Sequence, residues 1–158
     1  MHANYSLSNL AAQIYDSELD IGGTAAERDA ELIIIESWLA AHVGEVNTLL
    51  NTSFAVSGGE VIGFHEEEAG ILRELYVIQY YKKQTRSVLK QADNSANSLD
   101  FSELREGDSV VKRSSKRDHL KDYKSLIMHS QQILDKLIAN YNTYQSPPSQ
   151  VVEKDSYN

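Results

Sequence analysis

Apolar residues recur three and four positions apart along residues 24–50, which is the spacing of one face of a helix. Thr24 followed by Glu27 has the spacing of a capping box, so this helix is predicted to begin here. Its predicted seam consists of Leu32, Ile35, Leu39, His42, Val46 and Leu49, with Ile34, Trp38 and Ala41 on a neighbouring face. Gly44 either kinks the helix or separates two shorter ones.

A second apolar pattern predicts one long helix over residues 66–91. Its first turn is acidic and its later turns are basic, which complements the helix dipole at both ends. Two apolar stripes run along it, formed by Ile71, Leu75 and Ile78 and by Leu72, Tyr76 and Tyr80. A helix that is apolar on two faces is expected to be central, with neighbours on both sides.

A third long helix is predicted to start near Ser114 or Ser115, where Ser115 and Asp118 suggest a cap. Its stripe consists of Leu120, Tyr123, Ile127, Leu134, Leu137, Tyr141 and Tyr144, and Ser130 interrupts it. Pro147-Pro148 cannot continue a helix, so the chain beyond is expected to be extended. At the other end of the chain, Ser6 or Ser8 could cap a short helix.

Two stretches break the helical patterns. Residues 52–65 contain three glycines and β-branched residues, which indicates a loop with room for a short strand pair. Residues 92–113 are polar and form a connection of unusual length, which favours a function or a partner contact. We therefore predict an all-α fold: an antiparallel helical bundle over residues 1–145, with a long inter-helix loop and an extended C-terminal arm over residues 146–158.

Composition changes this picture mainly through charge. The 158 residues carry a net charge of −8, yet residues 1–70 hold twelve acidic residues and one basic residue, whereas residues 71–158 hold eleven and fourteen. Such a chain either associates head to tail with its own copies or neutralises its two parts within one domain. Cysteine is absent, and no secretory signal or membrane-spanning run is apparent, so we expect a chain that is cytosolic at synthesis.

The sequence offers little chemistry. His65-Glu66-Glu67-Glu68 begins like a zinc-binding motif, but Ala69 stands where the second histidine is needed. No phosphate-binding loop, calcium loop or nucleophile elbow is present in the sequence. His42, on an apolar seam, is expected to be a hydrogen-bonded core or interface residue. We expect no enzyme, no metal and no cofactor.

A basic cluster opens the last helix, formed by Lys112, Arg113, Lys116, Arg117, Lys121 and Lys124. It is a solvated helix start, a protein contact or a nucleic-acid contact. Asp118 and Asp122 lie within it at spacings that favour pairs with the lysines, such as Asp118 with Lys121. No aromatic residues are interleaved to stack on bases.

Three segments of the chain resemble small helical virion proteins of tailed bacteriophages, in particular head–tail connector (neck or adaptor) proteins. The segments are "IIIESWLAAHVGEVNTLLNTSF", "EEEAGILRELYVIQYYKKQTRSVLK" and "LREGDSVVKRSSKRDHLKDYKSLIMHSQQILDKLIANY", and the resemblance spans roughly residues 24–145. The resemblance rests on the overall sequence pattern, and its most distinctive parts are residues 38–54 and 105–109.

The resemblance implies a subunit of a ring, commonly of about twelve copies, beneath the portal protein of a DNA-filled capsid. It also implies that the C-terminal arm docks into the portal or an adjacent subunit and that the long loop meets a neighbouring neck or tail-terminator protein. DNA would pass through the ring without specific binding, and the protein would be located at the virion neck, after assembly in the host cytoplasm. The partner-binding residues expected on this basis are Arg105, Asp108, Lys112, Arg113, Lys116, Arg117, Pro147, Pro148, Gln150, Val151, Val152 and Tyr157.

The alternative is a small cytosolic helical binding or regulatory module. Its basic cluster at residues 112–124 would contact nucleic acid or an acidic partner. Salt-dependent binding to random duplex DNA would favour this alternative over the connector.

Overall fold

The structure is a computed structural model that describes residues 4–19, 22–94, 103–106, 109–112 and 116–145. These residues are mostly helical. In chain order the elements are β1 (Asn4–Ser6), α1 (Leu7–Gln13), the π-helical turn η1 (Ile14–Glu18), α2 (Ala25–Leu50), β2 (Ala55–Ser57), β3 (Glu60–Ile62), α3 (Glu66–Asn94), β4 (Glu103–Glu106), β5 (Ser109–Lys112) and α4 (Lys116–Gln145).

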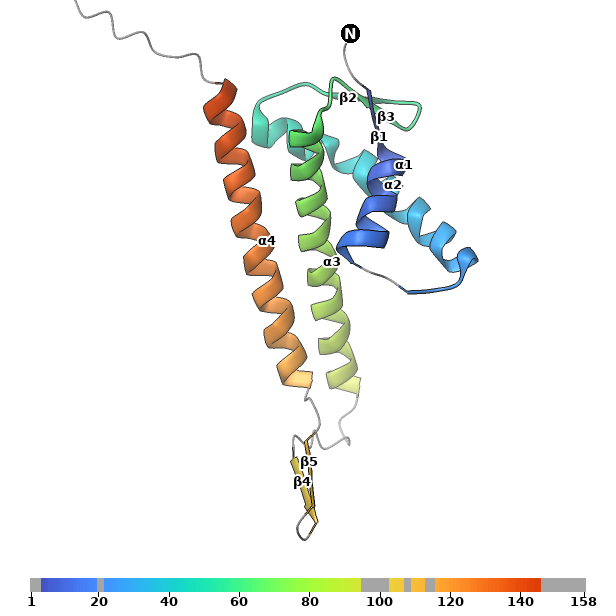
Figure 1. Cartoon of the computed structure of the whole chain (residues 1–158), viewed down its shortest axis with the longest axis vertical. Coiled ribbons are helices and arrows are strands. Elements are labelled where there is room, and N and C mark those ends of the chain that lie inside the picture. The colour runs from blue at the N-terminus through green and yellow to red at the C-terminus, as the bar shows by residue number, and fades with distance from the viewer. Residues whose placement is uncertain (1–3, 20–21, 95–102, 107–108, 113–115, 146–158) are drawn as a thin grey trace, which may run out of the picture.

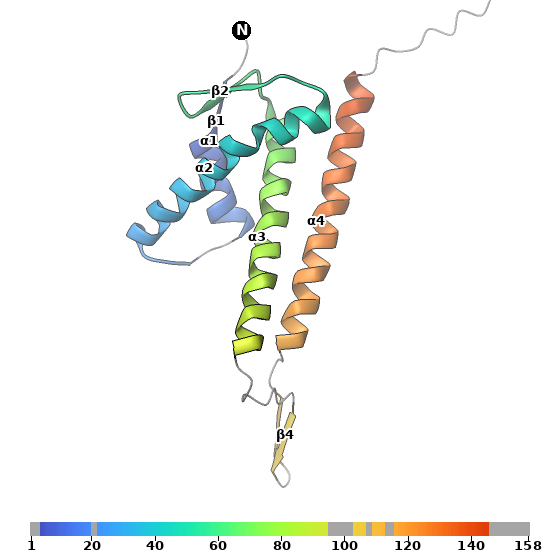
Figure 2. The same cartoon turned by 180° about the vertical axis from the view of Figure 1, so that it is seen from behind.

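The longest helices, α3 and α4, lie side by side and run in opposite directions (Figure 1). Helix α2 crosses α3 obliquely near its N-terminal end, and α1 packs against α2, as the view from behind also shows (Figure 2). Helix α3 therefore has neighbours on both sides, which confirms the prediction from its two apolar stripes. Helix α2 crosses α3 at an angle and does not run alongside it. Only α3 and α4 therefore lie side by side as the helices of an antiparallel bundle do.

Helix α2 begins where its sequence predicts. The backbone N–H and the hydroxyl of Thr24 both donate to Glu27 Oε2, at 2.8 and 2.9 Å, and the Glu27 N–H donates back to the hydroxyl at 3.4 Å. This reciprocal pair satisfies donors that a helix start otherwise leaves free. The helix then continues through Gly44 to Leu50, so the proposed division into two helices is wrong. It ends at Asn51, which has the left-handed conformation favoured after a helix (φ 53°).

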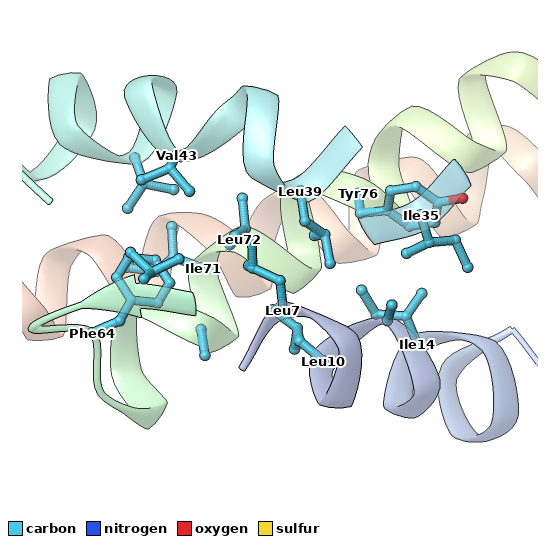
Figure 3. Packing of buried hydrophobic residues seen from close by; sticks show 14 of the residues in the cluster. Leu7, Leu10, Ile14, Ile35, Leu39, Val43, Phe64, Ile71, Leu72 and Tyr76 are labelled. Carbon is cyan, nitrogen blue, oxygen red and sulfur yellow. The ribbon is translucent and has the colours of Figure 1, made fainter. Parts of the chain in front are cut away.

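The hydrophobic core lies where α1, α2 and the first half of α3 meet (Figure 3). Leu7, Leu10 and Ile14 pack from one side against Leu39 of α2 and Leu72 of α3. The predicted α2 seam is only partly correct, because the buried positions are Ile35, Leu39, Val43, Val46 and Leu50. The side chain of Leu49 is 39% exposed and that of Ile34 is 53% exposed. The buried face of α2 is thus shifted by one residue at two positions relative to the predicted seam, because α2 packs against α1 and α3 together.

Helix α4 buries less of its predicted stripe. Tyr141 is buried and Leu134 and Leu137 are half-buried against the core, whereas Tyr144 is 80% exposed. Ser130, the residue that interrupts the stripe, is itself buried. The polar position therefore lies within the α3–α4 interface.

Two small antiparallel sheets correct the all-α prediction. In the first, β3 lies between β1 and β2, and the turn from β2 to β3 uses Gly58 and Gly59 at positive φ. The strand pair expected in residues 52–65 is thus present, and the N-terminal strand β1 adds to it. The second sheet is the β4–β5 hairpin, which lies in the predicted long loop beyond the ends of α3 and α4 (Figure 1). The predicted arm over residues 146–158 lies outside the described residues.

Candidate interaction surfaces

Exposed cations gather at one end of the α3–α4 pair. This basic end comprises Lys82, Lys83, Arg86 and Lys90 of α3 and Lys121 and Lys124 of α4, all of them exposed. Lys121 Nζ lies 4.0 Å from Asp118 Oδ1, which confirms the predicted i, i+3 pair. An exposed pair at this distance contributes little stability.

The partner residues expected from the sequence fall partly at this end. Arg105 lies in β4 opposite Val110, and Lys112 lies in β5 opposite Glu103, so the hairpin brings them to one small sheet. Lys116 and Arg117 are in the first turn of α4. The others lie outside the described residues: Asp108, Arg113, Pro147, Pro148, Gln150, Val151, Val152 and Tyr157. The basic later turns of α3 were recognised from the sequence, but their cations were not among the partner-binding residues expected from it.

The opposite end of α3 is acidic. Glu66, Glu67 and Glu68 occupy the first turn, where carboxylates are stabilised by the helix dipole. Glu68 is buried and accepts the His65 N–H at 2.8 Å, whereas Glu66, Glu67 and the nearby Glu60 on β3 are exposed. These three exposed residues define the acidic end. It is separated from Lys90 by about 36 Å along α3, at about 1.5 Å per residue.

Tyr5 lies beside the acidic end, and the pKa of its hydroxyl is affected. Its hydroxyl lies 3.4 Å from both carboxylate oxygens of Glu66, and burial together with this carboxylate raises the pKa of Tyr5. A cleft of about 530 Å³ opens beside it, lined by Tyr5, Phe64, His65 and Glu67 among others. Glu66 and Glu67, which also line this cleft, make it acidic.

A buried polar cluster joins α3 to α4 and η1. Glu74 of α3 is 6% exposed and hydrogen-bonds to Ser130 of α4. Burial raises the pKa of Glu74, against the opposing effects of Arg73, Ser130 and His129. Arg73 Nη1 pairs with Glu18 Oε1 at 3.5 Å, which ties η1 to α3. Glu74 and Ser130 thus make a buried contact within the α3–α4 interface, and the half-exposed Arg73–Glu18 pair lies beside it.

An aromatic groove lies between α2 and α3. It encloses about 320 Å³ and is lined by Ile34 and Trp38 of α2 and by Tyr76, Tyr80 and Lys83 of α3, among others. The Trp38 and Tyr76 rings meet edge to face with centroids 5.1 Å apart. The sequence places Trp38 and Tyr76 on apolar faces of two different helices, but only the crossing of these helices brings the two rings together.

His42 supports the wall of this groove. Its Nδ1 lies 2.8 Å from the Trp38 carbonyl oxygen, and its ring stacks on the Trp38 ring with centroids 3.7 Å apart. His42 is thus hydrogen-bonded and half-buried, as predicted. The contact orients the Trp38 ring. Among the described residues, His42 belongs to no group of side chains placed to hold a metal ion.

Within the residues that the structure describes, no group of three or more histidine, aspartate or glutamate side chains is placed to hold a metal ion. No helix within the same residues is long and apolar enough to cross a membrane. Comparison with protein-family models, curated proteins and solved structures finds no match to this chain.

Proposed function

We propose that this chain is a structural subunit of a tailed-bacteriophage head–tail connector, in which copies form a ring between the portal and the tail. The observation that carries the proposal is the separation of charge along α3, with Glu66 and Glu67 at one end and Lys83, Arg86 and Lys90 at the other. The resemblance of residues 24–145 to connector proteins supports the same assignment.

Charge separation matters because a ring requires two different faces on each subunit. Head-to-tail contacts close only where one patch meets its complement on the next copy. The acidic end and the basic end supply such a pair, and opposite charges also guide subunits into register. Acidic residues that face a central channel would repel DNA and let it pass without binding.

The remaining parts take roles consistent with this arrangement. We expect the α3–α4 pair to complete a helical bundle with neighbouring subunits and residues 146–158 to form the extended arm. The β4–β5 hairpin is suited to contact the portal or a neighbouring neck protein, since it extends beyond the helices with Arg105 and Lys112 on adjoining strands (Figure 1). The protein would act by shape and charge, without turnover, at the neck of the virion.

The experiment is to measure particle mass by native mass spectrometry or mass photometry at low and high salt. We expect a ring of about twelve copies that loosens as salt screens the contacts. Replacing Lys82, Lys83 and Arg86 by glutamate should prevent assembly. The matched control is Lys136→Glu, an exposed lysine on α4 away from the basic end, and it should assemble as the unmodified chain does.

A chain that stays monomeric at every salt concentration would contradict the proposal. If that monomer bound random duplex DNA with an affinity that fell steeply with salt, the binding-module alternative would replace it. The six exposed cations at the basic end make this the informative comparison.

A further inference from the structure

The aromatic groove defined above is open to a partner. Ile34 forms one rim and is 53% exposed, so its side chain is accessible from outside the groove. Trp38 and Tyr80 are half-buried, so parts of both rings face the groove and not the core. The groove thus presents flat aromatic surface in an enclosed volume of about 320 Å³.

Polar groups surround this aromatic floor. Tyr76 lines the groove, and its phenol is protonated at neutral pH, so its hydroxyl can donate a hydrogen bond. Gln79 and Gln84 line the same groove and carry amide donors. Aromatic faces beside hydrogen-bond donors are the features that bind a polyproline II segment, whose proline rings pack on the aromatics while its carbonyls accept hydrogen bonds.

The chain itself contains such a segment. Its only two prolines are adjacent, Pro147 and Pro148, and they follow directly after α4 ends at Gln145. Val151 and Val152 provide further apolar side chains beyond them. A proline pair enters the bound state with little loss of conformational entropy, because its backbone is already restricted.

We propose that the Pro147-Pro148 segment of a second copy of this chain docks in the aromatic groove between α2 and α3. The inference rests on the proposed function, which it deepens by naming one contact between neighbouring subunits. The occupant and its receptor are encoded in the same sequence, so every copy would carry one of each.

The geometry favours a second copy over the same chain. The ring of Tyr80 neighbours that of Tyr81 at 5.5 Å, and Tyr81 neighbours Tyr123 of α4 at 6.1 Å. From Tyr123 to the end of α4 is about 33 Å, at about 1.5 Å per residue. Three residues beyond Gln145 reach at most about 11 Å. The prolines of one chain therefore cannot return to the groove of that chain.

Trp38 provides a direct test, because it is the only tryptophan in the chain and lies in the groove. The receptor is the full-length chain carrying Pro147→Ala and Pro148→Ala, and the probe is a synthetic peptide of residues 145–158. We expect a saturable change in Trp38 fluorescence. The same peptide with both prolines replaced by alanine should bind with an affinity that is lower by about tenfold or more.

Adjacent isoleucines on α2 give a matched pair of receptor variants. Ile34→Asp places a charge on the groove rim and should weaken peptide binding by about tenfold or more. Ile33→Asp makes the same change at a position that is 66% exposed and does not line the groove, so it should bind as before. Circular dichroism of both variants checks that the helices are retained.

The proposal is overturned if millimolar peptide leaves Trp38 fluorescence unchanged, if the proline-free peptide binds equally well, or if the two isoleucine variants behave alike. These results differ from a failure of the connector proposal. Rings that form while the peptide does not bind overturn the groove contact alone. Peptide binding by a chain that never forms rings supports the groove and contradicts the connector.

Discussion

Gly44 is the residue whose role the structure changes most. It lies on the exposed side of α2, within a continuous helix, and a Cβ atom placed on it meets nothing within 4 Å. Glycine in a helix interior is less favourable than alanine because its unfolded backbone is more free. No packing contact in the described residues therefore requires glycine at this position.

Gly44→Ala should raise the free energy of unfolding by about 1 kcal/mol. The measurement is the midpoint of chemical denaturation compared with that of the unmodified chain. Gly59→Ala provides the contrast, because Gly59 has φ +80° and its Cβ would lie 3.3 Å from Glu36 Oε1. That substitution should lower stability, and a destabilised Gly44→Ala would mean that α2 needs a flexible point there.

Single residues were predictable where a local rule decides them. Thr24 and Glu27 form the capping box that their spacing indicates, and Ser6 caps α1 by accepting the Asn9 N–H. Val43 and Leu50 were missed as core positions because the apolar stripe on α2 is wide, and its width does not determine which part of it is buried. That direction is set by α1, which packs against α2 from elsewhere in the chain.

At the scale of elements, the α3–α4 interface is held by apolar residues around one polar contact. Glu74 and Ser130 meet in its interior, and Leu137 of α4 packs beside Gly70 of α3. A buried carboxyl is more stable in its neutral form, which is why its pKa rises. The folded protein therefore binds this proton more tightly than the unfolded chain does.

This difference predicts a pH dependence. Wild-type stability should fall relative to Glu74→Gln as pH rises above 4.5, the ordinary pKa of glutamate, because the native state must then ionise a buried group. Below that pH the two proteins should converge. The measurement is the difference in denaturation midpoint at about pH 4 and about pH 8, so that shared titrations cancel.

Glu45→Gln removes an exposed carboxylate from α2 and controls for the loss of one negative charge. A constant difference between wild type and Glu74→Gln at both pH values would show that Glu74 titrates alike in the folded and unfolded chain.

The long elements were predictable from their period, whereas among the short ones only α1 and the β2–β3 pair were expected, from a capping serine and from glycines. Stripes such as Leu72, Tyr76 and Tyr80 extend over several turns, so α3 could be recognised from its period alone. Strands β1, β2 and β3 have three residues each, too few for an alternating pattern to emerge. The four-residue strands of the β4–β5 hairpin were equally hidden within a polar connection.

At the scale of the whole molecule, the residues that form the hydrophobic core all precede the C-terminal segment 146–158. The core joins α1, α2, α3 and Tyr141 of α4, and residues 146–158 follow it. Ending the chain after Gln145 should therefore leave the helical content and the unfolding temperature unchanged. Under the connector proposal it should also abolish ring formation.

Circular dichroism and native mass spectrometry of the truncated chain check both parts of this expectation. Full assembly without residues 146–158 would remove the arm from the proposed mechanism. Loss of helical structure would show that the segment contributes to folding.

The candidate surfaces could be predicted only in part for a similar reason. The basic cluster was visible because its residues are neighbours in sequence, and Lys121 pairs with Asp118 as its spacing indicates. The aromatic groove was not visible, since Trp38 and Tyr80 belong to different helices. Their meeting depends on the angle at which α2 crosses α3, which no local pattern specifies.

The pairing of β1 with β3 bears on how the chain folds during synthesis. Asn4 leaves the ribosome well before its partner, Ile62. Strand β1 must wait for more than fifty further residues before it can pair, whereas α4 can be added last to an α3 that is already packed. The order in which these elements are synthesised therefore differs from the order in which they can pair: β1 is made before β3 but gains its backbone partners only after β3 has emerged.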